Sequence, residues 1–439
     1  MISDRLLAAI DDIVAVDPSL GPAAEVIGQW VEAAGGLDEI ALATVERLVW
    51  YELPYKWTGP PEEVAEIVRV AGLVLERVGE TRYAEVCRSE RTRVILDAYA
   101  TSSDDGFAAF EKAFRASGID PPDLDDFAWG EMMGMEEVEA ARLTSWALEA
   151  AMLAGRFVPG RSGWKTAARE VTAEALDAAR PELLGQTYRD VILTERIEHW
   201  LHRSEGNRKL HALRSHNANR LLHPIPPPAD ASERLEPIRW FLEAADADVR
   251  LTAAGYLPTA MVRAAADHFD WNLGWTDRPP RGQAELEPLM EIDGLLRRIG
   301  AVRRRGKELK LTARGRRMLA DEAVAWREVA ADLSEAGWLR AVAEVVTYLL
   351  VDGERLETEM EVVAAAVLGE AGWRMGEERP SSDGVSYAWW VTQRTLRVLG
   401  GIVVRGAWEE RALRLTDFGE ATLFEQIRVT ATGPQMLSR

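Results

Sequence analysis

Apolar residues recur at intervals of three and four along the first 223 residues, which is the spacing of one face of an α-helix. The segment 62–78 is a clear example. Short breaks rich in glycine and proline separate such segments, as at residues 35–36 and 59–61. The alternation that marks strands is weak before residue 225, so we expect an almost entirely helical amino-terminal half.

Shifts in composition predict the domain boundaries. Residues 119–126 form an acidic link with two prolines, and the four prolines of residues 224–228 form a stiff linker. The expected segments are an acidic helical domain (1–120), a second helical region whose end is rich in histidine and arginine (127–223), a proline-rich linker (224–231), a first small module (232–335) and a second one (336–430).

The carboxy-terminal half contains an internal repeat. In each copy a helix ends at a glycine, Gly300 or Gly400, which tolerates the left-handed backbone of a helix C-cap. Two short strands separated by a polar turn follow, and the second strand ends in a Leu-Thr pair. Its threonine, Thr312 or Thr416, can cap the next helix. The glycines lie 100 residues apart and the threonines 104, so the second copy has four more residues in its turn.

Helical periodicity before and after each hairpin completes the pattern. We expect a helix, helix, helix, two-stranded hairpin, helix order in both copies. The expected helices are 259–269, 284–299 and 313–319 in the first copy, and 339–351, 359–368, 387–399 and 417–427 in the second.

The phrase Gly-Ala-Val-x(8)-Leu-Thr-x-x-Gly-Arg, which begins at Gly300 behind a helix, resembles the wing of winged-helix proteins. The tandem arrangement is similar to that of proteins from high-GC, actinobacterial bacteria that end in two such modules, the first of which carries a segment like Leu251–Pro258. The resemblance covers roughly residues 232–428. It implies a mainly α fold, with a helical amino-terminal region followed by two winged-helix-like modules, and it implies no particular activity.

Charge is distributed unevenly along the chain. The formal net charge is -20, from 72 acidic and 52 basic residues. Residues 1–150 hold 30 acids and 12 bases, a net of -18, so the remainder is close to neutral. Within that remainder, residues 297–317 hold ten bases and one acid, and residues 196–223 hold six bases, two acids and five of the six histidines. These islands permit local binding of anions despite the total, although solvated helix faces and a charged edge strand would look the same.

The first basic island predicts a contact with nucleic acid through the wing. In winged-helix readers of DNA the helix before the wing enters the major groove. Here that helix, 284–299, carries Glu285, Glu287, Glu291 and Asp293, which would repel phosphate. We therefore expect the wing to lead any such contact. The candidate residues are Arg297, Arg298, Arg303, Arg304, Arg305, Lys307 and Lys310.

Tryptophan supplies the competing hypothesis. The chain has 16 tryptophans, most of them at positions expected in a core. The helix 387–399 is mostly apolar and includes a tryptophan pair, so it is expected to pack against another surface. The candidate contacts with a protein partner are Trp271, Trp275, Trp389 and Trp390.

The sequence contains only weak indications of enzymatic chemistry. Glu195, His199 and His202 share one helix face and could hold a divalent metal, but the spacing lacks a third histidine and an ordinary helix surface is the simpler interpretation. Residues 160–166 do not match a phosphate-binding loop, because Trp164 and Pro159 stand where that pattern needs glycine. The single cysteine, Cys87, excludes disulfides within the chain and is expected to be structural. We expect no cofactor.

Taken together, these patterns predict a cytoplasmic, non-enzymatic binding protein without a signal peptide or membrane span. Its winged-helix modules would assemble with a protein partner and touch nucleic acid through the basic wing. A winged-helix transcriptional regulator that binds DNA is the alternative, and a metal-dependent enzyme using the Glu195 segment is a more remote one.

Overall fold

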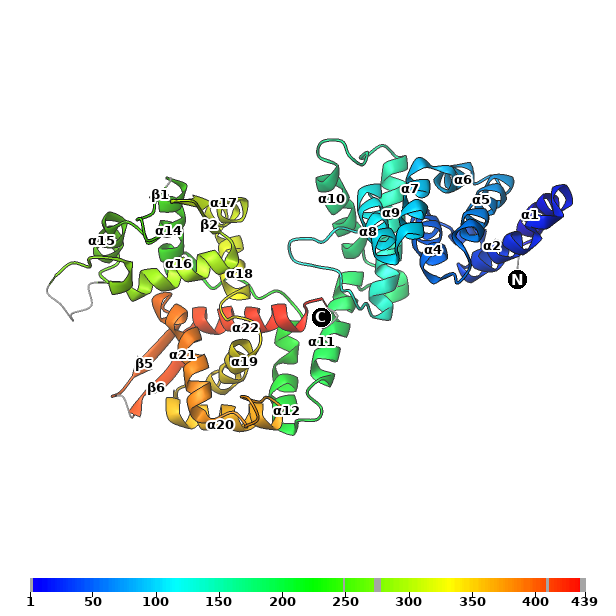
Figure 1. Ribbon diagram of the computed structural model, residues 1–439. Coiled ribbons are helices and arrows are strands. Elements are labelled where there is room, and N and C mark those ends of the chain that lie inside the picture. The colour runs from blue at the N-terminus through cyan, green and yellow to red at the C-terminus, as the bar shows by residue number, and fades with distance from the viewer. Residues whose placement is uncertain (1–2, 248, 272–277, 408–409, 435–439) are drawn as a thin grey trace. The chain divides into compact units, whose positions relative to one another are not determined.

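The computed structural model describes residues 3–247, 249–271, 278–407 and 410–434. The chain divides into two compact units, of which the first runs to Ile192 and the second from Leu193 to Gly433. The described residues are mainly helical, and their strands form two small antiparallel sheets, both in the second unit (Figure 1). The expected fold class, mainly α with small β-hairpins in the carboxy-terminal half, is confirmed. None of the described helices combines the length and the apolar character needed to cross a membrane.

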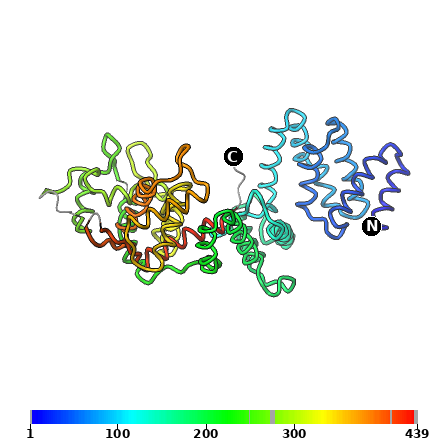
Figure 2. Tube along the Cα trace, turned by 90° about the horizontal axis from the view of Figure 1, so that it is seen from below, coloured from blue at the N-terminus to red at the C-terminus, as the bar shows by residue number. Residues whose placement is uncertain are grey.

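The first unit is built from helices that follow one another along the chain, as Figure 2 shows from the blue N-terminus onwards. Serine side chains at Ser3, Ser89 and Ser102 cap three of these helices by accepting hydrogen bonds from backbone N–H groups. The helices are α1 (Asp4–Val16), α2 (Gly21–Ala33), α3 (Leu42–Arg47), α4 (Leu53–Lys56), α5 (Pro61–Arg77), α6 (Thr81–Arg88), α7 (Glu90–Thr101), α8 (Ser103–Ser117), α9 (Met135–Leu153), α10 (Trp164–Asp177) and the start of α11 (Tyr188–His202). Short helical turns lie at Pro18–Leu20, Leu37–Glu39, Leu48–Glu52 and Pro181–Leu183.

The core of this unit consists of the apolar faces of α1 to α8. Trp50 is buried there, and its indole Nε1 donates a hydrogen bond of 2.7 Å to the Thr92 hydroxyl. Glu46 of α3 is also buried, with 4% of its surface exposed and one carboxylate oxygen without a hydrogen-bond partner. Burial raises the pKa of Glu46 to about 8, against a weaker lowering by Ser117 and Arg91.

The second unit contains two modules with the same order of elements: helix, strand, helix, helix, strand, strand, helix (Figure 1). The first module consists of α14 (Glu236–Asp246), β1 (Val249–Arg250), α15 (Thr259–His268), α16 (Glu287–Ile299), β2 (Val302–Arg305), β3 (Glu308–Leu311) and α17 (Ala313–Ala320). The second consists of α19 (Trp338–Leu350), β4 (Arg355–Leu356), α20 (Glu357–Glu370), α21 (Ser382–Val398), β5 (Ile402–Arg405), β6 (Ala412–Leu415) and α22 (Asp417–Ala431).

The remaining elements of the second unit connect and flank the modules. They are the rest of α11, α12 (Arg208–Asn217), α13 (Ala231–Arg234), α18 (Glu322–Ala331) and the turns Ala218–Leu221 and Gln283–Glu285. The border between the two units at Ile192 lies within α11, inside the segment 127–223 that the sequence treats as one region.

Each sheet has three strands, in the orders β1-β3-β2 and β4-β6-β5. The sequence predicted only the two-stranded hairpins, which was incomplete. The additional strands, Val249–Arg250 and Arg355–Leu356, have two residues each, and two residues are too few to display alternation.

The expected caps around the hairpins are present. Thr312 and Thr416 accept hydrogen bonds from the backbone N–H groups of Gly315 and Gly419, at 3.1 and 3.2 Å. A side chain at Gly419 would collide with the backbone oxygen of Gly401. The glycine in Leu-Thr-x-x-Gly is therefore required by the close approach of the last helix to the start of the hairpin.

Two of the expected helices begin three or more residues from the expected start. The helix expected at 284–299 starts at Glu287, after a separate turn at Gln283–Glu285, and has Pro288 in its first turn. The helix expected at 387–399 begins five residues earlier, at Ser382, because the Ser381 hydroxyl accepts a hydrogen bond from the Gly384 N–H and caps it.

The modules share a continuous apolar core. Leu399 and Phe418 of the second module belong to the same buried cluster as the helices of the first. The Trp326 indole of α18 donates a hydrogen bond of 3.1 Å to the Thr422 hydroxyl of α22, and both side chains are fully buried. The two modules are therefore packed together as one body, and a separate unfolding of either would expose this shared cluster.

We predict that replacing Glu46 with glutamine flattens the pH dependence of stability. The folded-state pKa of Glu46 is about 8 and its ordinary value is 4.5. The neutral form is favoured in the folded state, so the contribution to stability is complete below pH 4.5 and is lost as the pH rises toward 8. The loss is at most about 1.4 kcal/mol per pH unit.

Urea denaturation from pH 4.5 to 8.5 measures this effect. E46Q should be more stable than the wild type at pH 8, and the difference should shrink toward pH 4.5. The matched control is E66Q at an exposed position of α5, which should leave the profile unchanged. Parallel profiles for E46Q and the wild type would contradict the prediction.

Candidate nucleic-acid interface

The strand register separates the side chains of the first sheet into two faces. Val302 lies opposite Leu311, and Arg304 lies opposite Leu309. Because Val302, Leu309 and Leu311 are buried, this face covers the module's core. Successive side chains on a strand point to opposite faces, so the neighbouring residues of each strand lie on the outer face.

The outer face is basic. Arg303 lies opposite Lys310, and Arg305 and Arg250 lie opposite Glu308. Four bases and one acid therefore share this face, and Lys307 stands in the turn at its edge. Glu308 forms an ion pair of 3.0 Å with Lys310.

Arg250 of β1 is exposed, and three bases of the β2–β3 hairpin are also available for a ligand. Arg303, Arg305 and Lys307 are exposed and form no ion pair with any residue in the described part of the chain. The wing of the first module therefore presents free positive charge in a row along one hairpin. We call Arg303, Arg305 and Lys307 the wing bases.

The other predicted contact residues form ion pairs and hydrogen bonds within the second unit. Asp293 is fully buried, and its carboxylate lies 3.0 Å from Arg297 and 3.4 Å from Arg304. Arg298 donates to the backbone oxygen of Asp332 at 2.9 Å. Arg297, Arg298 and Arg304 remain predicted contacts with nucleic acid, but their guanidinium groups already have internal acceptors.

The acids of α16 pair with the second module. Arg394 of α21 lies 3.0 Å from Glu287 and forms a second ion pair with Glu291. Its guanidinium also lies over the Trp390 ring, 4.5 Å from the ring centre. Burial raises the pKa of Glu291, although Arg394 opposes this effect. The third helices of the two modules thus pack against each other, and the ion pairs link them at this contact.

The tryptophan candidates have different environments. Trp389 is fully buried in the core of the second module, so its assignment as a partner contact was wrong. Trp271 is partly buried and stacks on Phe269, with ring centres 4.5 Å apart. Trp275 lies outside the described residues. Trp390 is 40% exposed, and its ring lies 6.1 Å from that of Tyr387, which is 65% exposed.

The metal candidates do not form a binding site in the described part of the chain. His202 pairs with Glu205 on the helix surface at 3.0 Å, and His199 is exposed on the same helix as Glu195. No group of three or more histidine, cysteine, aspartate or glutamate side chains among the described residues is arranged to hold a metal ion.

The remaining sequence candidates take structural roles. Cys87 is buried on α6, and burial raises the pKa of its thiol to about 12, which keeps it protonated and unreactive. Residues 160–163 form a loop that leads into α10 without a preceding strand in the described part of the first unit, and Lys165 lies over the Trp164 ring.

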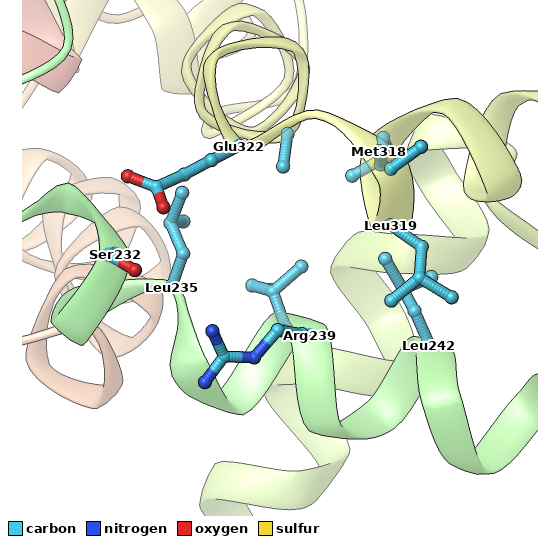
Figure 3. A pocket seen from close by; sticks show the side chains of 10 residues that line it. Ser232, Leu235, Arg239, Leu242, Met318, Leu319 and Glu322 are labelled. Atoms are coloured by element: carbon cyan, nitrogen blue, oxygen red, sulfur yellow. The ribbon is translucent and has the colours of Figure 1, made fainter.

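Hollows also occur among the described residues of the second unit, and two of them differ in size and lining. The smaller, of about 190 Å³, lies between α14 and the α17–α18 corner and is lined mainly by aliphatic side chains such as Leu235, Leu242 and Leu319 (Figure 3). Arg239 and Glu322 are at its edge. The larger, of about 540 Å³, lies between the α11–α12 turn and helices α19 and α20.

The second basic island does not extend the wing surface. Lys209, Arg214 and Arg220 pair with Glu370, Glu344 and Glu420 of the second module. Figure 1 shows α12 at the opposite side of this unit from the sheet of the first module. The basic face is therefore confined to the first hairpin and its surroundings.

Comparison with models of protein families, with curated proteins and with solved structures finds no match for this chain.

We predict that Arg394 and Glu291 stabilise the second unit cooperatively. Both side chains are mostly buried, with 22% and 18% exposed, so the loss of either leaves a charge in a poorly hydrated site. R394M and E291Q should each lower the free energy of unfolding by about 2 kcal/mol. The double variant should lose at least about 1 kcal/mol less than the sum.

Chemical denaturation of the four proteins measures the cycle. The matched control is R405M, which removes an exposed arginine that pairs with Glu354 across 3.3 Å. It should cost less than about 1 kcal/mol. Additive effects, or an R394M cost no greater than that of R405M, would show that the helix pair does not depend on this contact.

Proposed function

We propose that the two modules are winged helices and that the protein binds the phosphate backbone of nucleic acid through the wing of the first module, without a catalytic role. The observation that carries the proposal is the outer face of the β1-β3-β2 sheet. It holds the exposed, unpaired side chains Arg303 and Arg305, next to Lys307 in the turn. The order of helices and strands in each module and the strand order in each sheet agree with a winged helix.

The helix pair supports a wing-led contact and disfavours a helix-led one. Insertion into a major groove requires the third helix of a module to be accessible. Here α16 packs on α21, and its carboxylates Glu287 and Glu291 are bound to Arg394. A transcriptional regulator that reads bases with this helix would first have to separate the modules and expose their shared core.

The second sheet provides an internal comparison. Its outer face carries Val403 opposite Arg414 and Arg405 opposite Ala412. Arg405 is paired with Glu354. The corresponding face of the second module therefore offers less free charge at the same positions of the same fold. Contact with phosphate by few bases, without readout of base edges, implies weak binding that depends on salt and tolerates any sequence.

We predict that R303E/R305E weakens retention on heparin and binding to a mixed-sequence duplex at low salt. Loss of two phosphate contacts should reduce the slope of log affinity against log salt by about 2. Fluorescence anisotropy with a labelled duplex, measured over a series of salt concentrations, provides both the affinity and the slope.

The matched control is R405E/R414E, which makes the same charge change on the sheet of the second module and should reduce binding much less. Equal losses in the two variants would indicate an effect of net charge alone. Absence of duplex binding by the wild type at low salt would refute the proposal.

A protein partner is the second candidate, because Tyr387 and Trp390 form an exposed aromatic pair on α21. Aromatic side chains of this kind frequently supply most of the binding energy in protein interfaces. Met290 of α16, the helix that packs on α21, is also 40% exposed.

If this pair binds a partner, Y387S/W390S should lose a protein that the wild type retains in affinity purification after nuclease treatment. The wing variant R303E/R305E should retain the same protein. A retained set that is identical for the wild type and Y387S/W390S would exclude this surface as the contact.

A further inference from the structure

The larger hollow of the second unit is lined by arginine and tryptophan residues that are not part of the wing. It has a volume of about 540 Å³ and is open to solvent between the turn after α11 and the helices α19 and α20. Ligand sites of small molecules typically have a volume of about 300–1,000 Å³. We call this hollow the arginine cleft, after Arg203, Arg214 and Arg340, which line it.

Arg214 forms a fixed wall of the cleft. Its guanidinium pairs with Glu344 through two contacts of 2.7 and 3.0 Å and lies over the Trp200 ring, 4.3 Å from the ring centre. A third bond, of 3.0 Å, goes to the backbone oxygen of Trp200. Both members of the ion pair are mostly buried, so this pair supplies rigidity and little net charge.

Two further guanidinium groups have no matching carboxylate. Arg203 is exposed in the turn and forms no ion pair with any described residue. Partial desolvation and the nearby charge of Arg214 lower the pKa of Arg203, against a weaker effect of Glu344. Arg203 therefore contributes positive charge to the cleft that no carboxylate of the described residues pairs with.

Among the described residues, Arg340 is in contact with neutral acceptors, which hold its guanidinium group in the wall of the cleft. It donates to the backbone oxygens of Ala331 and Ser334, at 3.1 and 2.9 Å, and its buried Nε–H has no acceptor. Burial lowers the pKa of Arg340, while the more distant Asp332 and Arg298 act in opposite directions. At the rim, Glu370 is bound to Lys209 at 2.8 Å, so it does not neutralise either arginine.

The walls of the cleft include flat and apolar surface. Trp373 is partly buried and contributes an indole ring, whereas Trp200 is buried beneath Arg214. Excess positive charge beside an aromatic side chain suits a ligand with a negative group and a flat body.

We propose that the arginine cleft binds a small organic anion, in which one carboxylate or phosphate group meets Arg203 and a flat apolar body lies against Trp373. This site is separate from the wing bases and does not depend on the proposed contact with nucleic acid.

Isothermal titration calorimetry of the full chain tests the site with phenyl phosphate and benzoate as probes. These two probes distinguish a phosphate ligand from a carboxylate one, and benzyl alcohol is the neutral analogue. We expect binding of at least one anion and no detectable binding of benzyl alcohol. R203Q should weaken the bound anion at least about tenfold, because a charge-assisted hydrogen bond is lost.

The matched control is R208Q, which removes the same charge from an exposed residue one turn away that does not line the cleft. It should leave the affinity unchanged, and since both arginines are exposed neither variant should impair folding. The proposal is overturned if neither anion binds at millimolar concentration, if benzyl alcohol binds as well as the anions, or if R203Q and R208Q have equal effects.

Discussion

The contact between α16 and α21 partly covers the third helix of each module and so limits which surfaces of the second unit can bind a ligand. Arg394 lies between Glu287 and Glu291 on one side and the Trp390 ring on the other. A guanidinium group can serve both kinds of neighbour at once, because its edge donates hydrogen bonds to carboxylates while its plane stacks on an indole. The contact is reinforced by the shared apolar cluster around Phe418 and by the buried bond between Trp326 and Thr422.

This packing affects which basic residues of the first module stay exposed. Because the third helices pack against each other, the hairpin of the first module is an accessible basic element whereas α16 is partly covered. The buried carboxylate of Asp293 distinguishes the bases of that region, since it forms ion pairs with Arg297 of α16 and Arg304 of β2. Arg303 and Arg305 lie on the outer face of the sheet, where no described residue forms an ion pair with them. A single buried acid thus separates the arginines that are paired from those whose charge is available to a ligand.

The same reasoning separates the two basic islands. In residues 196–223, three bases are neutralised by acids of the second module, which makes α12 a structural support for α19 and α20. Arg203 is left over from this pairing, and it lies at the edge of the arginine cleft together with Arg340. Local net charge in the sequence therefore indicated where bases are concentrated, but the distribution of partners decides where positive charge is available.

Much of the fold could be read from local signals. Helical periodicity, the glycines at 300 and 400, and the threonine caps depend on neighbours within a few residues, so the sequence alone determined the two hairpin modules and the helical character of the chain. The roles of Trp389 and Trp390 depended on tertiary structure, because adjacent residues on a helix face different directions and only the packing of α19 and α20 shows which one is covered. The pairing of Glu287 and Glu291 with Arg394 could not be predicted from the sequence either, since it joins residues about 100 positions apart. Local sequence sets which elements form, whereas the partners that neutralise or bury their side chains come from distant parts of the chain and are fixed only when the modules pack together.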